Sequence, residues 1–112
     1  MQKDDLIRVR HMLDAAREAE SFAQNKTRSS LDTDRELVLA LVKAIEIIGE
    51  AAANVTNKYR EDLPQIPWPN IVGMRNRLIH AYFDINLDIL WNTVIEDLPS
   101  LITELEKILQ LE

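Results

Sequence analysis

Cysteine is absent from this chain of 112 residues, which has only two glycines and four prolines. The lack of cysteine excludes disulfide scaffolds, zinc sites built on thiolates and cysteine nucleophiles. So few turn-forming residues cannot serve a many-stranded sheet, and we therefore expect few, long elements of secondary structure. At this length the chain is expected to form a single domain over residues 1–112.

Long apolar runs are also absent, because none approaches the ~18 residues that a membrane-spanning helix needs. The first five residues have no apolar stretch behind a basic region, so they are not typical of a signal peptide. We therefore expect a cytoplasmic protein with no membrane partner. The net charge of −6 disfavours broad, non-specific binding of nucleic acid, which needs many basic side chains at the phosphates. Attraction to RNA would have to come from a local basic patch.

Apolar residues recur at helical spacing through most of the chain, which predicts an all-α bundle of four to five helices. The first helix is expected from about Asp4 to Asn25, with Asp4 or Asp5 as its cap. A polar break follows this helix.

A second helix is expected to begin at Asp32 or Thr33 and to end near Arg60. Thr33 and Glu36 have the spacing of a capping box. Two adjacent apolar stripes cover more of this helix than a surface helix needs, which favours a central position or a face shared with another subunit. The small residues among positions 49–53 would let another helix approach closely.

Residues 61–69 include three prolines and predict a rigid linker that reverses the chain. Trp68 is interpreted as a packing anchor at the edge of the domain. The third helix is expected to begin between Pro67 and Asn70 and to end near Phe83.

The last helix is expected to follow a short turn, with Asn86 or Asp88 as its cap. Pro99 lies within its apolar stripe. Because proline cannot donate the helical hydrogen bond, we expect this helix to be kinked or split near Pro99.

The third predicted helix carries the residues most suited to chemistry within an eight-residue stretch: Arg75, Asn76, Arg77, His80 and Tyr82. On an ideal helix Arg75 and His80 are roughly 140° apart, so one straight helix would not aim both at one point. The long arginine side chain could bridge the gap, or the helix could deform near its end. Alternatively, a two-fold dimer could bring two copies of each residue together.

These residues could cleave RNA without a metal. Histidine titrates near neutrality and can act as base or acid, while arginine matches two phosphate oxygens. No cluster of histidine and carboxylates has metal-ligand spacing. A structural role remains open as well: Arg75 could pair with Glu46 or Glu50, His80 could make ordinary hydrogen bonds, and Tyr82 could pack its ring on the core.

The pattern Arg75-x4-His80-x-Tyr82 matches the R-x4-H-x-Y signature of HEPN-domain toxins, and the chain resembles their HepT-like group. The resemblance covers nearly the whole chain after the first helix. Further landmarks of that group are matched at Ile47-Ile48-Gly49-Glu50-Ala51-Ala52, Ile66-Pro67-Trp68, Gly73-Met74-Arg75-Asn76, Trp91 and Asp97-Leu98-Pro99-x-Leu101.

This resemblance implies a HEPN-like bundle, a homodimer and a metal-independent endoribonuclease toxin that needs no cofactor. Arg75 and His80 would form the catalytic pair, with Asn76 as a polar auxiliary. The implied partner is a small MNT-type nucleotidyltransferase antitoxin, which in some systems transfers AMP to the motif tyrosine, here Tyr82. Arg77 lies outside the signature and is a candidate phosphate contact only. The alternative is a non-catalytic module that binds a nucleotide or a partner in a nucleotidyltransferase complex.

Overall fold

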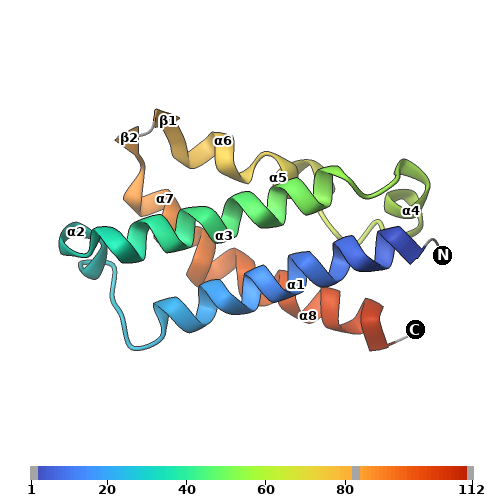
Figure 1. Ribbon diagram of the computed structural model, residues 1–112, viewed down its shortest axis with the longest axis horizontal. Helices are drawn as coiled ribbons and strands as arrows, with labels where there is room; N and C mark the ends of the chain where they lie inside the picture. The colour runs from blue at the N-terminus through green and yellow to red at the C-terminus, as the bar shows by residue number, and fades with distance from the viewer. Residues whose placement is uncertain (1–2, 82–83, 111–112) are drawn as a thin grey trace.

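The computed structural model describes residues 3–81 and 84–110, and the side chains of His80 and Ala81 lie outside that description. Within these ranges the chain is a helical bundle with one two-stranded antiparallel hairpin, so the predicted all-α class is confirmed (Figure 1). The elements in chain order are α1 (Lys3–Ala23), α2 (Ser30–Thr33), α3 (Arg35–Ala53), α4 (Asn57–Asp62), α5 (Trp68–Val72), α6 (Met74–Leu78), β1 (Ile79–Ala81), β2 (Asp84–Ile85), α7 (Leu87–Asn92), the π-helical segment η1 (Thr93–Asp97) and α8 (Leu98–Gln110).

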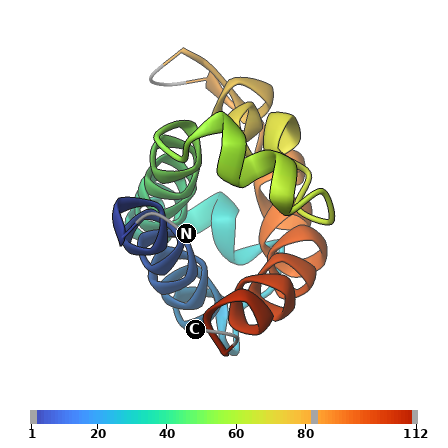
Figure 2. The same ribbon diagram turned by 90° about the vertical axis from the view of Figure 1, so that its right-hand side faces the viewer.

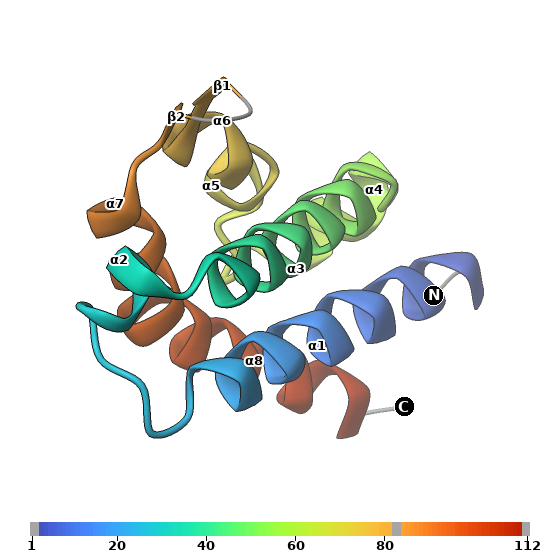
Figure 3. The ribbon, with the colours of Figure 1, turned by 60° about the vertical axis from the view of Figure 1, so that its left-hand side comes forward.

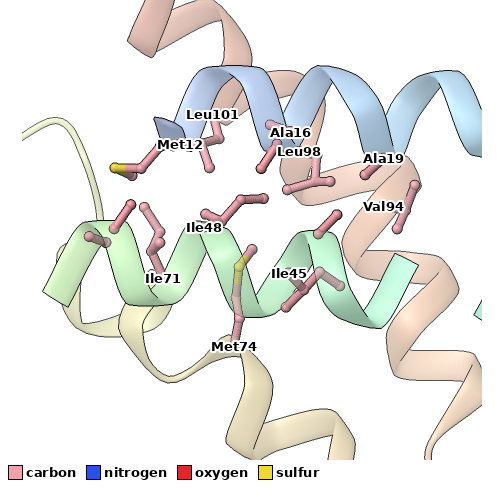
Figure 4. Close-up of a cluster of buried hydrophobic side chains, with 14 of the residues drawn as sticks. Met12, Ala16, Ala19, Ile45, Ile48, Ile71, Met74, Val94, Leu98 and Leu101 are labelled. Atoms are coloured by element: carbon pink, nitrogen blue, oxygen red, sulfur yellow. The ribbon is translucent and has the colours of Figure 1, made fainter. Parts of the chain in front are cut away.

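The core lies between α1, α3 and α8, and the end-on view in Figure 2 shows these helices surrounding it. Ile48 of α3 points toward α1, and the side chains of Ile45 and Ile48 are both fully buried (Figure 4). On α1 the facing positions include the small residues Ala16 and Ala19, which let the helices approach closely. The apolar stripes read from the sequence therefore form the core. No helix in the described ranges is long and apolar enough to cross a membrane.

The second predicted helix is divided into α2, α3 and α4. Asp34 lies between the first two, and its side chain accepts a 3.1 Å hydrogen bond from the backbone N–H of Leu37. The predicted capping box at Thr33 and Glu36 is therefore wrong by one residue, because the carboxylate of Asp34 caps α3.

The break between α3 and α4 is stabilised from the first helix. Asp5 is 2% exposed, and its two carboxylate oxygens accept hydrogen bonds from the backbone N–H and the hydroxyl of Thr56, at 2.9 and 2.8 Å. The Thr56 hydroxyl in turn accepts from the N–H of Tyr59 and caps α4. Asp5 thus ties α1 to α4. Because α1 already begins at Lys3, the prediction that Asp4 or Asp5 caps this helix is wrong.

The linker before α5 is held by Trp68, which confirms its interpretation as a packing anchor. Its ring is 5% exposed, and its indole N–H donates to the carbonyl of Leu63 at 3.1 Å. Arg60 lies over the ring, 5.9 Å from its centre, and donates to the carbonyl of Ala52 near the end of α3. This cation satisfies a helix-terminal carbonyl and packs on the aromatic face.

The last helix begins and bends where the sequence predicts. The side chain of Asn86 accepts from the N–H of Ile89, which confirms Asn86 as the cap of α7. The helix then widens into η1 immediately before α8 and Pro99. Pro99 has no N–H to donate to the preceding turn, and the π-type turn lies directly before it, where the sequence predicts a helix that is kinked or split.

Candidate functional site

The signature segment is placed by the packing of α5 on α3. A Cβ built on Gly49 would lie 3.4 Å from the carbonyl oxygen of Ile71 and 3.5 Å from that of Val72. These two backbones therefore meet at Gly49, as the small residues there led us to expect. The contact brings α6, which follows directly, alongside the middle of α3.

The third predicted helix is not continuous to Phe83, and this prediction is wrong. It breaks at Gly73, and α6 ends at Leu78, whose carbonyl accepts a 2.7 Å hydrogen bond from the N–H of Asn86. Ile79 is already extended, with φ −116° and ψ 113°, and it pairs with Ile85 of β2. The return strand therefore takes over the hydrogen bonding that would have continued the helix.

His80 consequently lies in β1 and not on a helix. The roughly 140° separation from Arg75 does not apply, and Asn76 and His80 do not share a helical face. Of the three ways considered to bring Arg75 and His80 together, the deformation of the helix near its end is present. Tyr82 lies outside the described residues. In Figure 3 the two strands project from one corner of the molecule, away from α1 and α8.

Arg75 lies on α6 with its side chain 44% exposed. Its Nε–H donates to Oε1 of Glu46 on α3 at 3.2 Å, and the Glu46 side chain is 32% exposed. Of the two carboxylates considered as structural partners, Glu46 makes the contact. Asn76, the next residue, is exposed. Arg75 is thus oriented by the scaffold and still open to solvent.

The surroundings of Arg77 differ from those of Arg75. It lines a cavity of about 570 Å³ together with residues from the linker, α5, α6, η1 and α8: Gln65, Ile66, Pro67, Asn70, Ile71, Met74, Glu96, Asp97, Ser100, Leu101, Thr103 and Glu104. Arg77 is the one basic residue in this lining, against three carboxylates. Such an acidic wall opposes a phosphate, and Arg75 is not among the lining residues.

This cavity was not predicted from the sequence. Glu96, Ser100, Thr103 and Glu104 recur at helical spacing, which marks one polar face along η1 and α8. That spacing could have indicated the face, but only the fold shows that it lies opposite Arg77. Over the described ranges, no group of three or more histidine, cysteine or acidic residues is placed to hold a metal ion.

A family model described as "Ribonuclease HepT-like" matches residues 12–108, which span the fold from α1 to α8 and include the whole signature. The chain belongs to the HepT-like family. The resemblance carried by the signature and its landmarks is therefore confirmed. No solved structure gives a significant match.

Several HepT-like relatives are similar over most of their length. "Probable ribonuclease HepT" of Thermococcus cleftensis is 45% identical over 75 residues, which cover 67% of this chain and 68% of the relative. "Putative RNase TTE0752" of Caldanaerobacter subterraneus subsp. tengcongensis is 43% identical over 79 residues, 70% of each chain. "Putative RNase MJ1380" of Methanocaldococcus jannaschii is 37% identical over 95 residues, which cover 85% of this chain and 87% of the relative. All three names describe ribonucleases.

Proposed function

We propose that this HepT-like chain is a metal-independent endoribonuclease with Arg75 and His80 as its catalytic pair. The observation that carries the proposal is the intact Arg75-x4-His80-x-Tyr82 signature inside a match to a ribonuclease family. The exposed, anchored guanidinium of Arg75 supports it, because such a group can meet a phosphate without rearrangement of the fold.

In the proposed reaction a 2′-hydroxyl of RNA attacks the adjacent phosphorus and the bond to the 5′-oxygen breaks. His80 takes the hydroxyl proton or protonates the leaving oxygen, with its counterpart role filled by water or by a second His80. Arg75 stabilises the charge that develops on the phosphate oxygens, and Asn76 hydrogen-bonds nearby. The products are a 2′,3′-cyclic phosphate and a 5′-hydroxyl.

A homodimer would supply two Arg75 and two His80 to one groove. Exposed apolar side chains are available to a second copy on this side: Leu39 of α3 is 49% exposed, and Val72, three residues before Arg75, is 37% exposed. Leu39 precedes Glu46 by two helical turns and so lies on the same face of α3. Covering both would remove apolar surface from water.

The toxin role is proposed together with a nucleotidyltransferase antitoxin in the cytoplasm. Transfer of AMP to Tyr82 would place a phosphate close in sequence to Arg75 and block RNA. Mass spectrometry of the chain co-expressed with a neighbouring nucleotidyltransferase should then show added AMP on Tyr82. An unmodified Tyr82 in a stable, inactive complex would show that inhibition is by occlusion.

The test of the nuclease is RNA degradation in excess chelator by the protein and its variants. Arg75→Ala and His80→Ala should each lower cleavage by about 10²–10⁴-fold, the range for a lost proton-transfer or electrostatic group, with melting temperature unchanged. Arg10→Ala and His11→Ala, which alter exposed residues of α1, are matched controls and should keep full activity. Full activity in both signature variants, or cleavage of RNA whose 2′-hydroxyls are replaced by hydrogen, would refute the mechanism.

A non-catalytic module that binds a nucleotide or a partner is the second candidate. The acidic wall around Arg77 and the net charge of −6 favour a partner with a basic surface, because both repel the phosphates of RNA. Nucleotide binding without RNA turnover would establish this alternative. The role of Arg77 as a phosphate contact stays a prediction, and Arg77→Ala should weaken RNA binding if it is correct.

A further inference from the structure

We propose that Glu46 is a positioning residue for Arg75: its carboxylate holds the guanidinium so that the terminal amino groups face an RNA phosphate. This inference rests on the proposed nuclease function and adds a residue from outside the signature. The contact joins Nε of Arg75 to Oε1 of Glu46 at 3.2 Å.

Glu46 extends from a rigid part of the scaffold. Ile45, directly before it, and Ile48, two residues after it, are fully buried in the core. Arg75, by contrast, lies on the five-residue helix α6, between a break at Gly73 and the extended chain from Ile79. The carboxylate therefore fixes a long side chain of the short helix relative to the most firmly packed helix.

The hydrogen bond uses one of the five donors of Arg75. A guanidinium presents its donors on two edges, and Nε lies at one end of the side edge. Among the described residues, Glu46 is the one hydrogen-bond acceptor found for Arg75. The two terminal amino groups therefore remain for the bidentate contact that a phosphate makes.

Stability does not explain this ion pair well. Both side chains are about one-third or more exposed, and pairs at such sites contribute little to the free energy of unfolding. The carboxylate also repels RNA in a chain that already carries a net charge of −6. The explanation that remains for the ion pair is the orientation of Arg75. A small misplacement of a group that contacts the reacting phosphate strongly lowers the rate of cleavage.

Two substitutions separate orientation from charge. In Glu46→Gln the amide oxygen can still accept the Nε–H, so kcat should stay within about threefold, while KM for RNA falls because a negative charge is lost. In Glu46→Ala the acceptor is gone, so kcat should fall by about tenfold or more without a rise in KM. Glu36→Ala, on the first turn of the same helix, removes the same charge from an exposed site and should leave kcat unchanged.

A structural role would give a different result. The proposal would be overturned if both variants lost the same fraction of kcat and if that loss matched a fall in melting temperature. Wild-type kcat in Glu46→Ala would also overturn it. An increase of kcat in Glu46→Ala would show that the carboxylate restrains Arg75 unproductively, and would overturn it as well.

A measurement without turnover separates this inference from the nuclease proposal. In ¹⁵N-labelled protein, the Nε–H signal of Arg75, assigned with Arg75→Lys, should be protected from exchange in the wild type and in Glu46→Gln, and lost in Glu46→Ala. Binding of a 2′-O-methyl RNA, which cannot be cleaved, should weaken in Glu46→Ala relative to Glu46→Gln. If the wild type cleaves no RNA, the nuclease proposal fails, and these two readings still decide whether Glu46 orients Arg75 toward phosphate. Identical signals and affinities in both variants would refute it.

Discussion

The scaffold formed by α1, α3 and α8 and the signature segment formed by α5, α6 and the hairpin differ in nearly every local property. The scaffold helices are long and bury continuous apolar stripes. The signature segment consists of two five-residue helices and two short strands, with its polar side chains exposed on α6. Stability and candidate chemistry therefore reside in different parts of the fold, as is common where a rigid framework presents a functional loop.

The two regions are joined by a small number of buried side chains. Met74 and Leu78, four residues apart on α6, are 3% and 0% exposed, and Figure 4 shows Met74 directed at α3. Arg75, Asn76 and Arg77 lie between these two anchors and are exposed. The anchors thus hold one face of α6 on the core and leave the remaining circumference for polar groups.

The largest effect on stability is expected from Leu41→Ala in the scaffold. Leu41 is fully buried on α3, so truncation should lower the free energy of unfolding by about 2–5 kcal/mol, as lost burial and a cavity combine. Denaturant titration measures this loss. RNA cleavage per folded molecule, measured where the variant is still folded, should be unchanged. A large loss of specific activity would show that the two regions are not separable.

Asp5→Ala should have the next largest effect. It removes the carboxylate, itself 2% exposed, that accepts from the N–H and the hydroxyl of Thr56, and hydrogen bonds to a charged group contribute about 1.5–3 kcal/mol. The bonds lie at the end of the molecule opposite the hairpin (Figure 1), so activity should persist. Asp4→Ala, an exposed change on the same turn, is the control, and equal destabilisation in both would contradict the role of the Thr56 contact.

Two helix-cap variants, one beside the hairpin and one in the scaffold, allow a direct comparison of the regions. Asn86→Ala and Asp34→Ala each remove a side-chain cap, and each should cost about 1 kcal/mol in thermal or denaturant unfolding. The backbone N–H of Asn86 also donates to the carbonyl of Leu78 at the point where α6 ends. Alanine keeps this N–H, but loss of the side-chain cap should loosen the backbone at this position and lower RNA cleavage as well. Asp34 caps the scaffold helix α3, and its variant should keep full specific activity. Equal activities in the two variants would break the comparison.

The scaffold is the part of the fold that the sequence predicted best. Repeated apolar spacing located α1, α3 and α8, because such spacing reports burial directly. The break after Ala53 was missed because the apolar stripe runs on through Val55, which is buried at 3% exposure although it lies outside a helix. The spacing of apolar residues indicates which side chains are buried, but it does not show whether the backbone between them is helical.

For the signature segment, the sequence predicted which residues are involved but not the conformation of their backbone. The signature residues were found from their spacing, and the family match is confirmed. The helix was expected to continue because residues 79–83 contain no glycine or proline to end it. Its end depends on β2 and on the N–H of Asn86, which are tertiary contacts that local propensity does not contain. The position of His80 and the contact that selects Glu46 over Glu50 follow from that tertiary structure.

The smallest expected effect comes from Arg28→Ala, which tests a surface link between the loop that follows α1 and the helix α7 that follows the hairpin. Arg28 binds Asp88 of α7 at 2.7 Å and Asp32 at 3.1 Å, and these hydrogen bonds, first that of Asp88, raise the pKa of Arg28 above its usual value. A raised pKa stabilises the fold at every pH below the usual pKa of the group and loses this effect only at more alkaline pH, so titration of Arg28 should not change stability between pH 6 and 9. Since these groups are exposed, replacement should lower the melting temperature slightly in low salt, and the difference from the wild type should disappear in 1 M salt. Asp88→Ala should behave in the same way. A loss of melting temperature that persists in 1 M salt in either variant would show that this link does more than add a screened charge pair. Reduced RNA cleavage would show that α7 transmits changes to the hairpin.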